Sequence, residues 1–137
     1  MNLYLDASAL IPLFIAEERT QDSEKALPGH VLVVSDFAVA EFSAGVARIV
    51  RMGEITESDA AAVFANFDTW LVNVAHREST AAADVLAAIA LVRRLDLGLR
   101  TADAVNVAIA QRCEGRLLTF DEKMAGAART LGMDVAG

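Results

Sequence analysis

Four acidic side chains spread along the chain have the clearest potential for chemistry: Asp6, Glu41, Asp103 and Asp121. Three have ordinary structural alternatives: Asp6 as a turn residue, Asp121 as a helix cap, and Asp103 as a first-turn partner of a helix dipole. Glu41 is harder to explain, because its sequence neighbours are apolar and no basic residue lies one helical turn away. Such a carboxylate is costly unless something pairs with it. A metal ion is the natural partner, although a distant arginine could serve.

The ligand types predict which metal this set would hold. Hard oxygen ligands without a histidine or cysteine cluster favour Mg²⁺ or Mn²⁺ over zinc. Two such ions about 4 Å apart can activate a water and stabilise the leaving oxygen in phosphodiester hydrolysis. A serine–histidine–aspartate triad is a weaker prediction, because His30 and His76 have no evident nucleophile beside them. The sequence also has no Walker A loop and no GxGxxG motif.

Composition limits the classes of protein to consider. The chain has 137 residues, 55% of them hydrophobic, and we expect a single domain over residues 1–137. The formal net charge of −7 argues against a basic nucleic-acid-binding face, but bound divalent ions would reverse the field at an acidic site. No apolar run is long enough for a membrane span, and no basic segment suggests a signal peptide. Because Cys113 is the only cysteine, a reduced cytoplasm is expected.

Alternating apolar segments indicate the elements that must position the acids. Strands are expected at 2–5, 31–34, 116–119 and 133–135, and the pattern at 70–74 allows a short strand. Helices are expected at 8–16, 17–27, 37–51, from 56 through 67, from 79 or 80 to 95, 101–112 after a Thr101 cap, and 121–132. This alternation predicts an α/β fold with a mostly parallel sheet covered on both faces. Asp6 and Asp121 should then lie at the same edge of the sheet, outside the carboxyl ends of its strands.

Four short segments together resemble a known family. They occur in the order Leu5-Asp6-Ala7-Ser8-Ala9-Leu10, Val39-Ala40-Glu41-Phe42, Arg100-Thr101-Ala102-Asp103-Ala104 and Leu118-Thr119-Phe120-Asp121. In this order the segments resemble the PIN domain, specifically the VapC-like toxins of bacterial and archaeal toxin–antitoxin pairs. The resemblance covers the whole chain. It implies a three-layer α/β/α sandwich, a magnesium-dependent endoribonuclease, cytoplasmic action, homodimer formation and inhibition by a cognate antitoxin.

Residue by residue, the resemblance implies that the four acids form a catalytic metal site. Ser8 and Thr119 fall where the family often has a hydroxyl that orients metal, water or a neighbouring carboxylate. The chain departs from many relatives at Asn106, where they have a histidine. Because asparagine cannot act as an acid or base near neutral pH, Asn106 is not counted as catalytic. In-line attack of water on RNA predicts products with a 5′-phosphate and a 3′-hydroxyl, and 2′,3′-cyclic ends would rule it out.

Other interpretations remain open at this stage. Two arginine groups either track phosphates or are solvated helix ends: Arg93, Arg94 and Arg100, and Arg48 and Arg51. A non-catalytic interaction module would use apolar helix faces as a groove for a partner helix, with core packing as the alternative. Those faces are Val46, Ile49, Val50, Phe64 and Phe67. A phosphorylated receiver-like domain is less convincing, because no acidic pair and no strand-end lysine accompany Asp6.

Overall fold

The computed structural model describes residues 1–136, and five parallel strands form its central sheet. Their order across the sheet is β3-β2-β1-β4-β5. The strands are β1 (Asn2–Leu5), β2 (Val31–Ser35), β3 (His76–Glu78), β4 (Arg116–Leu118) and β5 (Val135–Ala136). The prediction of a mostly parallel sheet is confirmed, and every strand pairing in the described chain is parallel.

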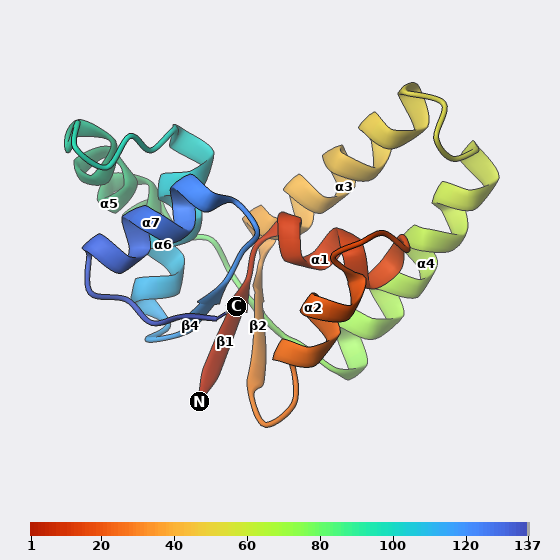
Figure 1. Ribbon diagram of the computed structural model, residues 1–137, viewed down its shortest axis with the longest axis horizontal. Coiled ribbons are helices and arrows are strands. Elements are labelled where there is room, and N and C mark those ends of the chain that lie inside the picture. The colour runs from red at the N-terminus through yellow and green to blue at the C-terminus, as the bar shows by residue number, and fades with distance from the viewer. Residues whose placement is uncertain (137) are drawn as a thin grey trace.

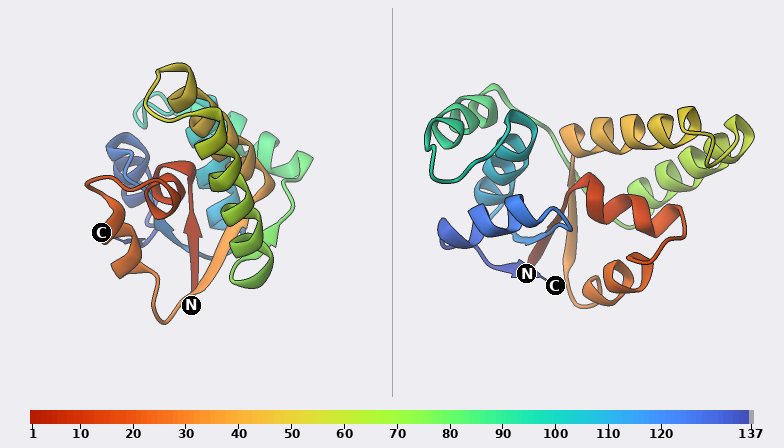
Figure 2. Two further views of the ribbon diagram at one scale, coloured as in Figure 1. Left: turned by 90° about the vertical axis from the view of Figure 1, so that its right-hand side faces the viewer. Right: turned by 45° about the horizontal axis from the view of Figure 1, so that its top comes forward.

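Helices cover both faces of the sheet, so the predicted three-layer α/β/α arrangement is also confirmed (Figure 1). One layer consists of α1 (Ala7–Phe14), α2 (Thr20–Ala26), α3 (Asp36–Arg51) and α4 (Glu57–Asn73). The other consists of α5 (Ala82–Arg93), α6 (Thr101–Arg112) and α7 (Glu122–Thr130). Figure 2 shows α3 and α4 as a pair of helices that projects beyond the sheet.

The central strands feed two hydrophobic cores, because successive side chains of a strand point to opposite faces. In β1, Leu3 and Leu5 pack in the core under α1, α3 and α4, whereas Tyr4 packs in the core under α5, α6 and α7. All three side chains are fully buried. Burial on both faces explains the continuous apolar run of β2, which is typical of parallel sheets. Within residues 1–136, no helix is both long enough and apolar enough to cross a membrane.

Helix boundaries show where local sequence signals held and where they failed. The helix expected at 37–51 is α3, and Ser35 caps it, its hydroxyl accepting from the backbone N–H of Ala38 at 3.0 Å. The strand allowed at 70–74 is wrong: α4 continues to Asn73, held at its start by a capping box and near its end by stacked Phe67 and Trp70 rings. The Thr101 cap is also wrong, since α6 begins at Thr101 without a side-chain cap.

Two further expected helices begin later than predicted, because Glu18 and Arg19 lie in a turn before α2 and residues 79–81 are neither helix nor turn. The helix expected at 17–27 covers only α2, and the helix expected from 79 or 80 begins at Ala82. The chain then crosses to the far side of β1, placing β4 next to it. The connections leaving the carboxyl ends of β1 and β4 therefore diverge, which opens a crevice at that edge of the sheet.

Candidate active site

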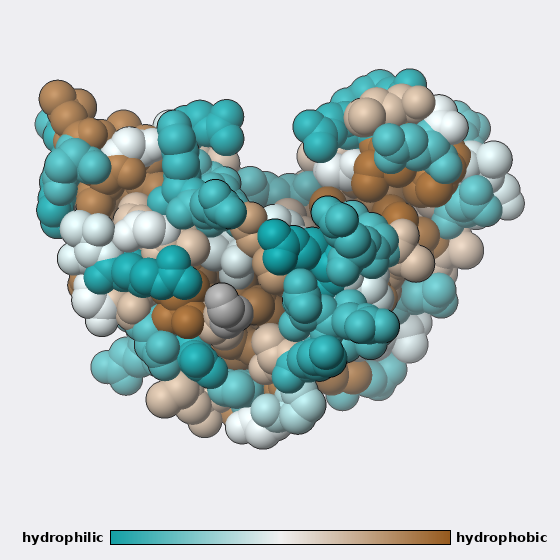
Figure 3. Space-filling model, viewed as in Figure 1, coloured by the Kyte–Doolittle hydropathy of each residue, from teal (hydrophilic) through white to brown (hydrophobic). Residues whose placement is uncertain are grey.

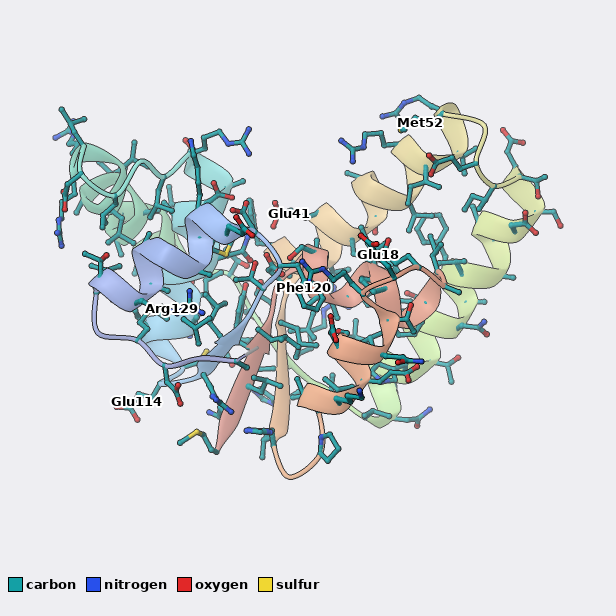
Figure 4. The ribbon with its side chains drawn as sticks, viewed as in Figure 1. Glu18, Glu41, Met52, Glu114, Phe120 and Arg129 are labelled. Carbon is teal, nitrogen blue, oxygen red and sulfur yellow. The ribbon has the colours of Figure 1, made fainter. Side chains whose placement is uncertain are left out.

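The four acids come from four different elements and line one cavity of about 560 Å³. Asp6 directly follows β1 and caps α1, while Asp121 follows β4 and caps α7. Asp103 lies in the first turn of α6, and Glu41 lies on α3. Figure 4 shows Glu41 in the notch between α3 and the layer of α5, α6 and α7. The capping interpretation of Asp121 is therefore correct, Asp6 proves to be a helix cap as well, and both roles coexist with the shared cavity.

Asp6 is the most enclosed of these carboxylates, with an exposed fraction of 4%. Its Oδ1 accepts from the Ser8 hydroxyl at 2.7 Å and from the backbone N–H of Ala9 at 3.1 Å. Its Oδ2 accepts from the Thr119 hydroxyl at 2.6 Å. Since each carboxylate oxygen has two acceptor positions, Oδ2 keeps one for a further partner. The orientation of Asp6 is therefore fixed without using all of its hydrogen-bond acceptor positions.

The two hydroxyls that hold Asp6 also join the ends of β1 and β4. The Ser8 oxygen accepts from the backbone N–H of Phe120 at 2.8 Å, and the Thr119 oxygen accepts from that of Asp121 at 3.1 Å. Ser8 and Thr119 lie 3.2 Å apart through their oxygens. The family resemblance implies that these hydroxyls orient metal, water or a neighbouring carboxylate. The geometry supports the last of these roles. It also ties Asp121 to the same network.

Asn106 supplies a partner for Glu41 that sequence reasoning missed. Its amide nitrogen donates to Glu41 Oε1 at 2.6 Å and to the carbonyl of Ala102 at 3.1 Å. Its amide oxygen accepts from the Tyr4 hydroxyl at 2.6 Å. Because this bond uses the only hydroxyl hydrogen of Tyr4, the Ser35 hydroxyl must donate to Tyr4 across their 2.7 Å contact. The hydroxyls of Ser35 and Tyr4 and one amide hydrogen of Asn106 therefore donate in succession toward Glu41.

Burial governs the ionisation of three of the acids. It raises the pKa of Asp6 to about 6, despite opposing hydrogen bonds from Thr119, Ser8 and Ala9. Burial also raises the pKa of Glu41, against the hydrogen bond from Asn106, and nearby Asp6 and Asp103 raise it further. The pKa of Asp103 is raised first by burial and then by the charge of Asp121. In each case the protein does not fully compensate the charged carboxylate for its loss of hydration.

The donor set fits a hard divalent cation, but the side chains do not form a closed cage. Among residues 1–136, no three acidic, histidine or cysteine side chains converge closely enough to hold an ion by themselves. Mg²⁺ commonly keeps several waters and uses only one or two carboxylates, so such convergence is not required. The cavity is wide enough for a hydrated ion, and Asp6 and Glu41 keep acceptor positions toward it.

Other candidate residues have identifiable surroundings. Arg100 lines the acidic cavity, with its Nε 3.8 Å from Asp103 and its side chain 86% exposed. His76 contacts Glu78 at the surface, and His30 contacts the carbonyl of Pro28. The other arginines proposed to track phosphates do not line this cavity. They are Arg48, Arg51, Arg93 and Arg94. Two residues of the suggested partner groove are core residues, namely Val46 and Phe67.

Comparison with known proteins identifies the family. The family model for the PIN domain matches residues 3–130. The chain belongs to the PIN-domain family. It is 31% identical to ribonuclease VapC3 of Pyrobaculum aerophilum over 91% of this chain and 93% of that protein. It is 33% identical to ribonuclease VapC46 of Mycobacterium tuberculosis over 97% of this chain and 95% of that protein. The sequence resemblance to VapC-like PIN domains is thus confirmed.

Solved structures confirm the PIN-like sandwich at lower sequence identity. Mycobacterium tuberculosis VapC20, described as a toxin that cleaves the sarcin–ricin loop, superposes with a TM-score of 0.71. It is 19% identical, over 91% of this chain and 94% of that chain. Neisseria gonorrhoeae FitAcB superposes with a TM-score of 0.74 at 15% identity, over 98% of this chain and 96% of that chain. At these identities the likeness concerns the fold of the PIN domain.

Proposed function

We propose that this PIN domain is a metal-dependent endoribonuclease, the toxin of a toxin–antitoxin pair, which hydrolyses RNA phosphodiester bonds with Mg²⁺ or Mn²⁺. The observation that carries the proposal is a cavity lined by four carboxylates, three of which have pKa values raised mainly by burial. Membership in a family with relatives named VapC ribonucleases supports the reaction class. We assign the catalytic and metal-binding roles to Asp6, Glu41, Asp103 and Asp121.

A bound divalent ion would supply Lewis-acid stabilisation of the phosphate and would lower the pKa of an attacking water. The protein's contribution is to hold oxygen ligands in place. Ser8 and Thr119 fix Asp6, while Asn106 fixes Glu41. The α6 dipole favours the ionised form of Asp103 in the first helical turn, partly offsetting its burial. Neutral Asn106 holds a carboxylate in position and exchanges no proton itself.

Proposed partners follow from the same family. Solved relatives include a toxin–antitoxin complex from Klebsiella pneumoniae and VapBC-1 from Haemophilus influenzae. We propose that this chain likewise binds an antitoxin protein and acts in the cytoplasm as one PIN-like domain over residues 1–137. Homodimer formation is part of the proposal, and exposed apolar side chains on and after α5 offer surface for it. These are Val85, Leu86, Ile89 and Leu95.

Incubation with RNA tests the proposed reaction. Purified protein is mixed with total cellular RNA in Mg²⁺ and, separately, in chelator, and the new ends are mapped. The expected result is cleavage only with the metal, leaving 5′-phosphate and 3′-hydroxyl ends. Cyclic 2′,3′-phosphate ends would exclude hydrolysis by water. A non-catalytic interaction module of PIN fold, the alternative function, would yield no metal-dependent product from any RNA.

A further inference from the structure

The acidic cavity adjoins two cavities that contain basic side chains. The first, of about 410 Å³, shares Asp121 with the acidic cavity and is also lined by Arg19 and Arg129. The second, of about 370 Å³, shares Arg19 and Phe120 with the first and is also lined by Lys25. The shared lining residues place the three cavities in a row. This row leads from the acids toward the surface beside α2 and α7.

Phe120 lies at the middle of this row, two residues beyond β4. Figure 4 shows Phe120 between α2 and α7, with Arg129 on the α7 side. The guanidinium carbon of Arg19 lies 5.1 Å from the centroid of the Phe120 ring, and the ring is half-buried. An aromatic ring beside an arginine is a combination on which a nucleobase can stack without regard to its identity.

The basic side chains of this region have little compensation nearby. Among the ion pairs of residues 1–136, Arg129 and Lys25 have no acidic partner within 4 Å. Arg19 contacts Asp22 at 3.4 Å, but both side chains are about half exposed, so the pair is weak. The surface is mixed, since Asp22 and Glu122 also line these cavities. Figure 3 shows hydrophilic side chains on both sides of the hollow on this face.

We propose that this surface, the basic track of Arg19, Lys25, Phe120 and Arg129, binds single-stranded RNA next to the phosphate that is cleaved. The inference rests on the proposed function. A strand whose phosphate enters the acidic cavity must carry its next phosphates out again, past a protein of net charge −7. The basic track begins beside Asp121, which lines both the acidic cavity and the first basic one, so Arg19 and Arg129 would meet those phosphates. A base would stack on Phe120 beside Arg19.

Binding of RNA separates this proposal from the nuclease function. A labelled single-stranded oligoribonucleotide of mixed sequence is titrated in Mg²⁺ with Asp6→Asn protein, whose cleavage should be too slow to consume it during the titration. In this background, Arg19→Gln and Arg129→Gln should each weaken binding about fivefold at 0.1 M salt. Each should also reduce the slope of log K against log salt by about one, as expected for one lost phosphate contact. Phe120→Leu should weaken binding about fivefold with little change in slope.

Arg93→Gln is the matched control. Arg93 is also exposed, has no ion pair among the described residues and lines none of the three cavities. Because Arg93 lies outside all three cavities, we take it as a solvated helix end and not as a phosphate contact, so its substitution removes the same charge but should leave RNA binding unchanged. Since Arg19 and Arg129 are exposed as well, their variants should fold normally, which thermal melting checks.

Each of three outcomes would contradict one specific claim. If Arg19→Gln and Arg129→Gln bind RNA as Arg93→Gln does while the wild type still cleaves, the basic track is not an RNA site. If the same two variants lose only antitoxin binding, the track is a protein-docking surface and the inference is wrong. If the wild type neither binds nor cleaves RNA with any divalent metal, the proposed function itself fails.

Discussion

Buried carboxylates lie beside both ends of α6, and their pKa values are shifted in opposite directions. At the far end, Asp84 is 2% exposed and accepts two hydrogen bonds from Arg112, at 2.7 and 2.9 Å. Arg112 thereby lowers the pKa of Asp84 and of its neighbour Glu78. At the beginning of α6, Asp103 and the nearby Asp6 are buried to a similar degree, yet burial raises the pKa of both.

The two clusters differ in whether the protein itself supplies a cation as the partner of the buried carboxylate. Where the fold needs a buried acid, this chain supplies an arginine with several matched hydrogen bonds. At the acidic cavity it supplies mainly neutral donors, the hydroxyls of Ser8 and Thr119 and the amide of Asn106. Neutral donors fix the orientation of a carboxylate but do not neutralise it. We therefore infer that a cation from solution would stabilise the charged form of these buried carboxylates.

Asp6→Asn should produce the largest change in activity, because it removes a charged ligand but keeps a similar shape. We expect RNA cleavage to fall by roughly a hundred- to a thousandfold. The melting temperature in chelator should stay unchanged or rise slightly, because the relief of the buried charge is offset in part by the loss of the hydrogen bond that Asp6 accepts from Thr119. Cleavage assays and thermal melting measure the two effects. A large drop in melting temperature would instead make Asp6 a structural residue.

Arg112→Gln should have the opposite profile. It leaves Asp84 buried without its cation, which should cost about 3 kcal/mol of unfolding free energy. Urea denaturation measures this loss. Cleavage per folded molecule should stay close to wild type, because Arg112 lies about 14 Å along α6 from Asp103. Arg93→Gln, an exposed control, should change stability by less than about 0.5 kcal/mol; an equal loss in both variants would refute the structural role of Arg112.

The pH dependence of stability in chelator should distinguish the two clusters. The raised pKa of Asp6, about 6 against an ordinary 3.8, means that the folded state holds its proton more tightly than the unfolded state. The resulting stabilisation is complete below pH 3.8 and disappears as pH rises through 6. The loss is on the order of 3 kcal/mol between these limits. Glu78 and Asp84, with lowered pKa values, contribute the opposite trend at lower pH.

Urea denaturation between pH 4 and pH 7 measures this dependence, with Asp6→Asn as the control. The variant should lose the Asp6 contribution and show a flatter profile over the same range. If the profiles of wild type and variant were parallel, the buried Asp6 carboxylate would not carry the electrostatic cost that we assign to it.

Tyr4→Phe should have the smallest effect of the four. It removes the hydroxyl that links Ser35 to Asn106, leaving buried polar atoms without a partner at a cost of about 1–2 kcal/mol. The amide of Asn106 would then be held less firmly, so metal affinity should fall several-fold. Denaturation and metal titration measure the two effects. A stability loss with unchanged metal affinity would limit Tyr4 to a role in the core.

Local sequence signals predicted the parts of the site that depend on strand ends. Asp6 directly follows one apolar strand and Asp121 closely follows another, and a parallel sheet brings such positions to one edge. Glu41 was noticeable because its surroundings lack any basic residue. Sequence reasoning missed the contact of Asn106 with Glu41 because it joins residues 65 positions apart. The spacing of Asn106 after Asp103, about one helical turn, was the available signal.

The fold was missed chiefly where tertiary packing overrides local pattern. Strand β3 has the sequence His-Arg-Glu and is mostly exposed at the sheet edge, so it carries no apolar signal. The apolar residues at 70–74, just before it, suggested the strand instead, but Trp70 and Leu71 belong to α4 and pack in the hydrophobic core on that face of the sheet. At α6, the hydroxyl of Thr101 suggested a cap, yet the helix already begins at that residue.

Calorimetric titration of the chelator-treated protein with Mn²⁺ or Mg²⁺ tests most directly whether the acidic cavity requires a cation. Near pH 6 we expect binding to release protons, because an Asp6 carboxyl with a pKa of about 6 is then half protonated and must lose its proton to bind the metal; at pH 7.5 it is almost fully ionised and little release is expected. Affinity should fall at least about tenfold by pH 5. It should also fall in Glu41→Gln but not in Glu78→Gln. Absence of binding at millimolar metal, or binding indifferent to both pH and Glu41→Gln, would contradict the account.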